Sequence, residues 1–201
     1  GIDSPVASWL MMKRGCRVDF LHFHTFKNNQ QAFNSKIKNL VEILNKYQRK
    51  SKLYLVPYSI YEILTQGRVL QKYDLVFFKY FMLNFADKLV KENHYDAIVL
   101  GDNLGQVASQ TIENLKATSL GISSLIFRPL LTYDKQEIIN LSEKIETYEL
   151  SIKKYKDCCS ILSKNPSTKT KPKAFENVLR KIEVNEIVEK SMKELEKFEV
   201  E

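Results

Sequence analysis

Short apolar runs alternate with longer amphipathic segments along most of the chain, and this alternation constrains the fold more than any other feature. Runs typical of buried strands occupy 17–24, 53–57, 97–100 and 125–127. Such alternation predicts βαβ units, a parallel sheet and helices on both of its faces. We therefore expect a doubly wound α/β fold. Ligands bind such sheets at the carboxyl ends of the strands, so a site is expected in the loops that follow them.

The segments between these runs have the spacing of helices. Helices are predicted at 29–47, 60–64, 73–91, 106–116 and 134–145. The segment 73–91 is apolar on most sides, which is typical of a helix in the middle of a domain or at a subunit contact. A subunit contact there would make the protein a homodimer.

The character of the sequence changes after about residue 163. Residues 165–173 are polar and basic and contain two prolines, which is typical of a loop. The amphipathic segments 175–182 and 184–198 are predicted as helices packed on the main body. We therefore expect a main domain at 1–163 and an appendage at 164–201.

Composition adds three weaker expectations. The net charge of +7 suggests a polyanionic partner, although many lysines lie in polar stretches and a solvated surface would give the same charge. The three cysteines do not form a disulfide framework, which fits a reducing compartment and a cytoplasmic location. No run is long and apolar enough to cross a membrane, so no membrane partner is expected.

The first five residues, Gly1 to Pro5, have the signals of a helix start. Asp3 and Ser4 are good caps, Pro5 suits a first turn, and the apolar run that follows ends at Gly15. A helix start with free N–H groups is an anion site, although an ordinary capped helix would show the same five residues. No strand-like run precedes this loop, so we expect the strand that feeds it to lie upstream of Gly1.

A second glycine stretch occupies 101–111, after the strand predicted at 97–100. Gln106 and Gln110 are four residues apart and would share one face of the predicted helix near its start. A helix with polar surface residues is the simpler interpretation of this stretch alone. Two glycine loops, each between a strand and a helix, favour a phosphate and nucleotide site.

Both stretches resemble motifs of one family, the tRNA 4-thiouridine synthases. Residues 1–7 and 12–15 look like its pyrophosphate-loop (PP-loop) motif, and 104–111 is similar to its second signature. Further matches follow in the family's order: His22-Phe23-His24, Arg128-Pro129-Leu130, Asp134-Lys135, Thr147-Tyr148-Glu149 and Asp157-Cys158-Cys159. Together the matches cover nearly the whole chain.

The resemblance implies a PP-loop ATP pyrophosphatase domain of the adenine nucleotide alpha hydrolase type over 1–163, with its first strand truncated. It implies an ATP-dependent tRNA sulfurtransferase, which adenylates the C4 oxygen of the uridine at position eight of tRNA. A persulfide sulfur then displaces AMP and leaves 4-thiouridine. ATP and Mg²⁺ are the implied cofactors and tRNA is the implied partner. Some relatives also serve thiamine synthesis.

The resemblance also implies roles for single residues. It assigns the pyrophosphate to the backbone of the first loop and Mg²⁺ to Asp3, whose carboxylate suits a hard cation. Lys79 stands where the family usually has an arginine that contacts ATP, and the neighbouring family arginine is Tyr80. The implied nucleotide contacts are Gly1, Ile2, Asp3, Ser4, His22, Phe23, Lys79, Gly101 and Gln110.

Cys159 aligns with the family's catalytic cysteine, and the resemblance makes Cys159 and Asp3 the catalytic residues. Thiolates are the reactive form of cysteine, and the basic residues Lys153, Lys154, Lys156 and Lys164 are expected to favour one. Cys158 and Cys16 are expected to be inert. The sulfur would come from a persulfide donor, either a cysteine desulfurase or a separate carrier. The family is similar in being dimeric.

Two other functions remain open from the sequence. A PP-loop ligase or amidotransferase acting on a small carboxylate would share the fold but would not need Cys159. A non-catalytic tRNA-binding module with a decayed ATP site would explain the replacement of two arginines by Lys79 and Tyr80.

Overall fold

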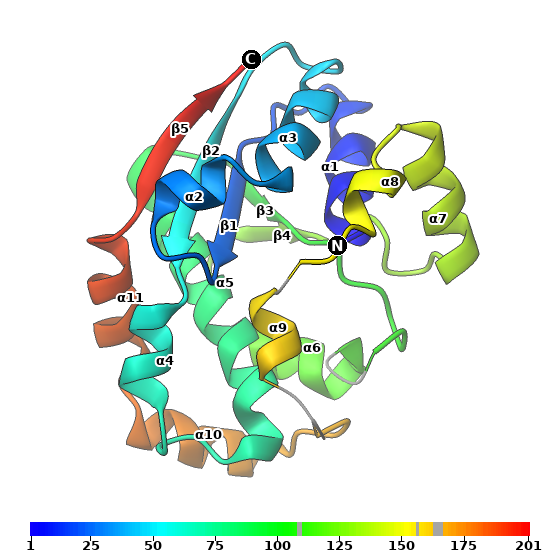
Figure 1. The fold of residues 1–201 in the computed structure, drawn as a ribbon. Coiled ribbons are helices and arrows are strands. Elements are labelled where there is room, and N and C mark those ends of the chain that lie inside the picture. Colours follow the sequence, from blue (N-terminus) through cyan, green and yellow to red (C-terminus); the bar gives the residue numbers. More distant parts are fainter. Residues whose placement is uncertain (108–109, 156, 163–166) are drawn as a thin grey trace.

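The structure is a computed structural model that describes residues 1–107, 110–155, 157–162 and 167–201 (Figure 1). Two groups of strands form its sheets. Strands β1 (Phe20–His24) and β2 (Ser51–Pro57) are parallel, and β5 (Glu196–Val200) pairs antiparallel with β2. Strands β3 (Ala97–Val99) and β4 (Leu125–Phe127) form a separate parallel pair. The α/β architecture with parallel strands is as the sequence predicts.

Helices connect the strands. Among the described residues they are α1 (Asp3–Met12), α2 (Asn29–Phe33), α3 (Lys36–Asn45), α4 (Ser59–Thr65), α5 (Asp74–Asn93), α6 (Ile112–Thr118), α7 (Lys135–Lys144), α8 (Tyr148–Ser151), α9 (Cys158–Ile161), α10 (Pro172–Lys181) and α11 (Val184–Met192), with a 3₁₀ turn at Gln71–Tyr73. Asp134 and Glu137 form a capping box at the start of α7, which is why that helix begins where its sequence predicts.

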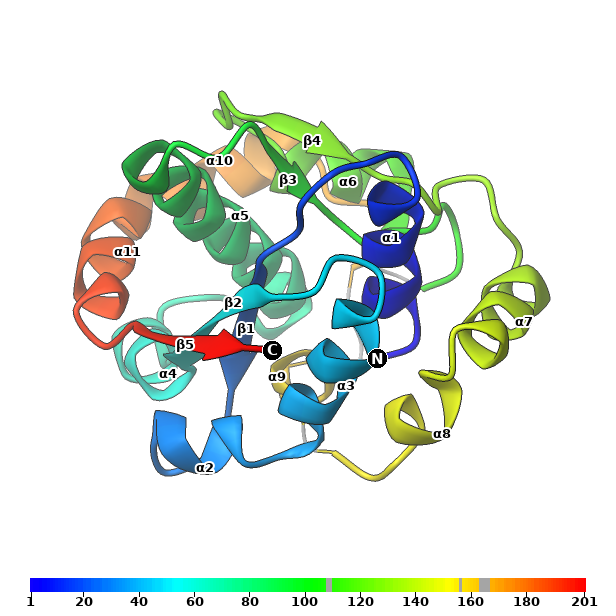
Figure 2. The same cartoon turned by 90° about the horizontal axis from the view of Figure 1, so that it is seen from above.

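The helices cover both faces of the sheet formed by β1, β2 and β5 (Figure 2). Apolar residues of α2 and α3 pack on Leu53, Leu55 and Val200 from one side. An aromatic-rich core of α4, α5, α10 and α11 covers Phe23 and Val56 from the other side. A third apolar group joins α1 to α7. This is the doubly wound arrangement, and β3 and β4 run toward the start of α1 (Figure 1).

The strand β5 is the largest correction to the sequence prediction. The helix predicted at 184–198 ends at Met192, and the chain then forms β5 along the edge of β2. Phe198 and Val200 alternate with the exposed Lys197 and Glu199, which is the period of a strand with one buried face. The charged residues made this short stretch look like the continuation of an amphipathic helix.

Smaller corrections concern helix starts. The helix predicted at 29–47 is two helices, because Asn28 caps α2 and the Ser35 hydroxyl caps α3. Asp3 lies in the first turn of α1 and makes no capping hydrogen bond, since Ile2 holds the cap position. The helix predicted from Gln106 begins at Ile112, where Thr111 caps α6.

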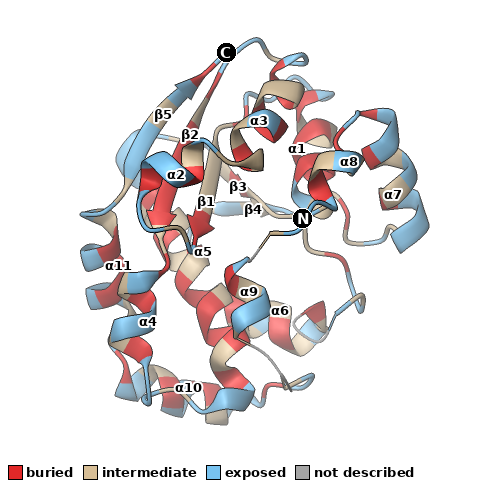
Figure 3. Ribbon diagram, in the orientation of Figure 1, coloured by how far each residue is buried: buried red, intermediate tan, exposed pale blue. Residues whose placement is uncertain are grey.

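Helix α5 is buried by the chain itself. Val76, Phe77, Phe78 and Phe85 have no exposed side-chain surface, and α5 contacts α6, α11 and β3 (Figure 3). Its apolar surface therefore needs no second subunit to cover it. Among the described residues, no helix is both long and apolar enough to span a membrane.

Candidate functional site

The turn after β3 touches the start of α1. A Cβ atom built on Gly101 would lie 2.9 Å from the backbone nitrogen of Ser4 and 3.1 Å from the Cβ of Asp3. Contacts under 3.0 Å do not occur between a real Cβ atom and backbone, so the absence of a side chain is what lets the two loops meet. The two glycine stretches of the sequence therefore form one site.

Asp3 is the carboxylate at this junction. Burial raises its pKa above the usual value, and the negative charge of Asp102 raises the pKa further, while Lys79 and Lys135 lower it. Lys135 is the first residue of α7, and its charge acts on Asp3 from across the site. A partly buried carboxylate beside another carboxylate is a favourable place for a cation.

Asp102 joins three elements through two ion pairs. Its carboxylate accepts a hydrogen bond from Lys79 of α5 at 3.3 Å and from Arg128 after β4 at 3.3 Å. The three side chains are between 13 and 19% exposed, so the pairs are shielded from solvent. Tyr80 turns the other way and packs on Phe175 in the core. Lys79 and Tyr80 stand where the resemblance predicts two arginines. Of the two, Lys79 is the one that contacts Asp102.

The second glycine loop is held from the segment after β4. Asn103 donates hydrogen bonds to the carbonyls of Leu130 and Tyr133, and Gly105 takes a φ of +77° that only glycine adopts readily. The side chain of Gln110 is buried, and none of the described residues bonds its Oε1 atom. Ala108 and Ser109, which belong to the matched signature, lie outside the described residues.

His22 and Phe23, at the end of β1, face opposite ways. The ring of Phe23 lies in the core against Phe81 and Phe85, so the part of Phe23 available to a ligand is its backbone. His22 is partly buried and makes a 2.7 Å hydrogen bond with the hydroxyl of Tyr155. Burial lowers the pKa of His22 to about 3, so this imidazole is neutral near pH 7.

Cys159 lies in the short helix α9, which Asp157 caps. The thiol is partly buried, and burial raises its pKa. The positive charge of Lys79 lowers this pKa and the negative charges of Asp157 and Asp102 raise it, so Cys159 lies within electrostatic reach of the Asp102 cluster. Cys158 is buried in the aromatic core, and its pKa is raised to about 12, mainly by burial.

The predicted basic activators of Cys159 are corrected by the structure. Lys153 and Lys154 are exposed, and neither is among the charges that act on the thiol. Lys156 and Lys164 lie outside the described residues. The charge that lowers the pKa of Cys159 most is that of Lys79, which lies on α5 and is far from Cys159 in the sequence.

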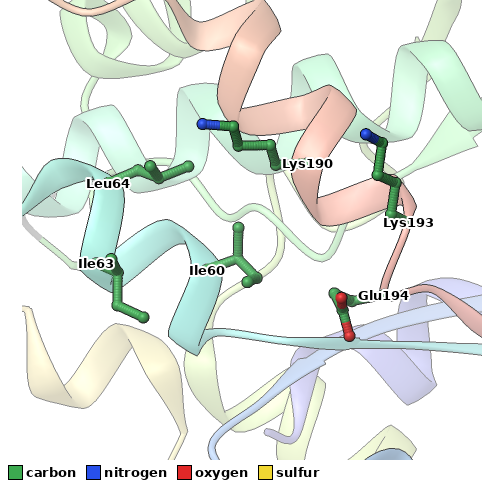
Figure 4. A pocket seen from close by; sticks show the side chains of 6 residues that line it. All are labelled: Ile60, Ile63, Leu64, Lys190, Lys193 and Glu194. Carbon is green, nitrogen blue, oxygen red and sulfur yellow. The ribbon is translucent and has the colours of Figure 1, made fainter.

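Two surface grooves lie away from these residues. The first, of about 240 Å³, runs between α4 and α11 and is lined by Ile60, Ile63, Leu64, Lys190, Lys193 and Glu194 (Figure 4). The second, of about 310 Å³, lies between α5 and α11. No group of three or more His, Cys, Asp and Glu side chains within the described ranges is arranged to bind a metal ion. A cation at Asp3 would therefore need further ligands from its substrate or from water.

The glycine turn against a helix start, at the carboxyl ends of parallel strands, defines a nucleotide-binding α/β protein of the PP-loop type. Comparison with known proteins gives the family. The family model described as thiamine biosynthesis protein (ThiI) matches residues 1–184, and the chain belongs to this family.

Curated relatives and a solved structure agree with this assignment. A probable tRNA sulfurtransferase of Thermoanaerobacter sp. (strain X514) is 38% identical over 94% of this chain and 50% of its own length. One of Mycoplasmopsis synoviae (strain 53) is 43% identical over 84% of this chain and 45% of its own. A crystal structure of a 4-thiouridine synthetase–RNA complex with bound ATP superposes with a TM-score of 0.88 at 30% identity, covering all of this chain and 53% of that one. The chain thus spans about half the length of these relatives.

Several residues of the site were not singled out from the sequence. Arg128, Asn103 and Lys135 lie in matched motifs or beside them, but only the fold brings them to Asp102, to the second loop and to Asp3. Tyr155 and Lys36 carried no sequence signal, since each is an isolated residue of a common type.

Proposed function

We propose that this chain is the ATP-dependent catalytic part of a tRNA sulfurtransferase, which adenylates the C4 oxygen of uridine 8 in tRNA and replaces it with sulfur. One observation carries the proposal. The Gly101 turn lies against the start of α1, and the charges of Lys79 and Asp102 act on both Asp3 and Cys159. The related 4-thiouridine synthetase was crystallised with RNA and ATP, which supports both ligands.

The residues suit the binding of ATP. Backbone N–H groups from Gly1 to Ser4 point from a helix start and would hold the pyrophosphate. Lys79 would contribute positive charge, and the backbones of Gly101 and Phe23, with His22 and Gln110, would line the rest of the nucleotide site. The buried Oε1 of Gln110 has no hydrogen-bond donor among the described residues. A donor on the bound nucleotide would supply one.

Asp3 is the proposed Mg²⁺ ligand. Its pKa is raised by burial and by Asp102, so a cation would relieve an unfavourable charge there. A bound Mg²⁺ would neutralise the charge that develops on the phosphates. Asp3 itself would orient this ion, while Lys79 and Lys135 would hold the anionic groups from two sides.

The reaction needs two steps. The C4 oxygen of uridine attacks the α-phosphorus of ATP, and the bond to pyrophosphate breaks. The terminal sulfur of a persulfide then attacks C4, and AMP leaves with the oxygen. When the Cys159 thiolate attacks the inner sulfur of the donor, the sulfur–sulfur bond of the persulfide breaks, and a disulfide between Cys159 and the donor remains for a thiol to reduce.

Several further parts stay proposals. The sulfur donor would be a cysteine desulfurase or a separate persulfide carrier, and the active form would be a cytoplasmic homodimer. Residues 1–163 would form the PP-loop domain, with 164–201 as a basic loop and terminal elements packed on it. The exposed Lys169 and Lys171 beside α6 would meet the tRNA backbone, so tRNA binding should weaken with salt.

The test uses the full-length protein that carries these 201 residues. It is incubated with ATP, Mg²⁺, unmodified tRNA, a cysteine desulfurase with cysteine as the persulfide donor and a reducing thiol, and 4-thiouridine is measured by its near-ultraviolet absorbance. Product formation that is lost in Cys159→Ser supports the proposal. ATP turnover that does not depend on tRNA, is equal in the wild type and in Cys159→Ser, and yields no 4-thiouridine favours a ligase acting on a carboxylate. Salt-sensitive tRNA binding without ATP–pyrophosphate exchange favours a non-catalytic binding module.

A further inference from the structure

Lys36, the first residue of α3, makes contacts that the proposed chemistry does not use. Its ammonium group donates hydrogen bonds of 2.8 Å to the carbonyls of Ser151 and Lys153. The same group lies 5.2 Å from the centre of the Tyr155 ring, within the range of a cation–π contact. One side chain therefore holds three points of the segment that leads from α8 to α9.

One of these contacts satisfies the end of a helix. Helix α8 ends at Ser151, and the Ser151 carbonyl, which has no partner within the helix, accepts a hydrogen bond from Lys36. The second bond, to the Lys153 carbonyl just beyond the helix, fixes the direction in which the chain leaves α8. Lys36 is itself partly buried; burial lowers its pKa, and the negative charge of Asp157 raises it.

The segment that Lys36 restrains lies between His22 and Cys159, two residues of the candidate site. Tyr155 bonds His22 at 2.7 Å, and its ring also packs on the rings of His22 and Phe26. Four residues further on stands Cys159. In Figure 1 the helices α8 and α9 lie on either side of the start of α1.

We propose that Lys36 is a positioning residue, which anchors the segment from Ser151 to Tyr155 and so holds Cys159 beside the nucleotide site. The role rests on the proposed function in one respect, that Cys159 acts in sulfur transfer. Lys36 touches neither reacting group in this arrangement. Its loss should therefore affect the sulfur step and leave adenylation in place.

The test compares Lys36→Met with Lys38→Met in the full-length protein. Lys38 lies on the same helix, but its side chain is 39% exposed and pairs with Glu42, so it is a matched control. Three rates are measured: pyrophosphate release that depends on tRNA, 4-thiouridine formation, and alkylation of Cys159 by iodoacetamide, read by mass spectrometry of its peptide. The exposed Cys16 serves as the internal standard for alkylation.

In Lys36→Met we expect thiolation to fall by about 100-fold, as for a misplaced reacting group, with pyrophosphate release within a few-fold of wild type. Alkylation of Cys159 should rise by about 10-fold, because two charge-assisted hydrogen bonds no longer restrain the segment. Lys36→Gln, which keeps a hydrogen-bond donor but loses the charge, should show the same pattern more weakly. It is the second variant if Lys36→Met does not fold.

Two results would overturn the inference. Equal thiolation and alkylation in Lys36→Met and Lys38→Met would show that the anchor does not matter. An equal loss of pyrophosphate release and thiolation would make Lys36 a nucleotide contact. Failure of the proposed function is distinguishable, since the wild type would then release no pyrophosphate, while the alkylation of Cys159 in the two variants still decides whether Lys36 anchors the segment.

Discussion

The backbone of Ser4 occupies the space that a side chain on residue 101 would need. A Cβ atom at Gly101 would lie 2.9 Å from the Ser4 nitrogen, and that nitrogen belongs to the first turn of α1, which cannot move without shifting the helix. This contact brings the two glycine loops of the chain into one site.

Gly101→Ala should therefore cost both stability and ligand affinity. Overpacking of this kind costs about 1–3 kcal/mol, and we expect a loss of that order in the free energy of unfolding. Displacement of the first turn of α1 should weaken ATP binding at least 10-fold, since 1.4 kcal/mol changes an affinity tenfold. Chemical denaturation and calorimetric titration with ATP measure the two effects.

Gly121→Ala is the control for this change. Gly121 has a φ of +75° and nothing within 4 Å of a Cβ, so alanine there strains the backbone without touching the site. It should lose stability and retain its affinity for ATP. If Gly101→Ala binds ATP as tightly as Gly121→Ala does, the close approach has no part in nucleotide binding.

Asp102 should be a structural as well as an electrostatic centre. Asp102→Asn leaves Lys79 and Arg128 facing each other with no anion between them. Because the three side chains are largely shielded, we expect the free energy of unfolding to fall by about 1.5–3 kcal/mol. Glu189→Gln, which removes an exposed partner of Lys88, should change it by less than about 1 kcal/mol. Similar losses in the two variants would contradict the shielding argument.

The sequence predicted the parts of this fold that depend on local pattern. The strand β4 and the capping box before α7 lie where an apolar run and cap residues place them. The first glycine loop was found from its helix-start residues, and the second from its place after a predicted strand. β5 was missed because only two apolar residues, Phe198 and Val200, mark it, and its pairing with β2 is a contact across most of the chain.

The site was predictable only as far as motifs reach. Asp3, Gly101 and Cys159 stand in matched stretches, and the structure brings the charges around them together. The partners that set their geometry, Arg128 and Tyr155, depend on how separate elements pack, which no local pattern encodes. Lys153 and Lys154 were wrong as activators of Cys159, since both are exposed and neither is among the charges that act on the thiol.

Acid should destabilise the fold through its buried histidines. Burial lowers the folded-state pKa of both His22, to about 3, and His24, whereas the unfolded value is 6.5. A depressed histidine pKa means that the unfolded state binds more protons below pH 6.5, so stability is full above that pH and falls as the pH drops toward the folded value.

The expected loss from His22 is about 1 kcal/mol per pH unit between pH 6 and 5, and His24 adds to it in the same direction. Urea denaturation at pH 7.5, 6 and 5 measures it. His24 is fully buried, accepts a hydrogen bond from the Phe26 N–H on Nδ1 and bonds Asn29 through Nε2, so a proton on Nδ1 would break the first bond. His22→Gln should reduce the slope of the free energy of unfolding against pH. An unchanged slope would mean that His22 binds the same number of protons in the folded and unfolded states over this range.

Asn114 should hold residues 167–171, the described part of the basic loop, against α6. Its side chain has no exposed surface, donates a hydrogen bond to the Ser167 carbonyl and accepts one from the Thr170 N–H. Asn114→Ala removes both bonds and leaves the backbone groups of residues 167 and 170 without these partners, at a cost of about 1–3 kcal/mol.

The loss should act first on residues 167–171 and only then on the whole fold, because none of these residues belongs to an apolar cluster. Trypsin should then cut after the exposed Lys169 about 10-fold faster, a ratio that corresponds to 1.4 kcal/mol of local opening, and salt-sensitive tRNA binding should weaken with it. Asn140→Ala is the control, at an exposed asparagine on α7 that bonds Gln136. It should leave the rate of cleavage after Lys169 and the affinity for tRNA unchanged. Cleavage after Lys169 at the wild-type rate in Asn114→Ala would mean that other contacts hold residues 167–171 in place.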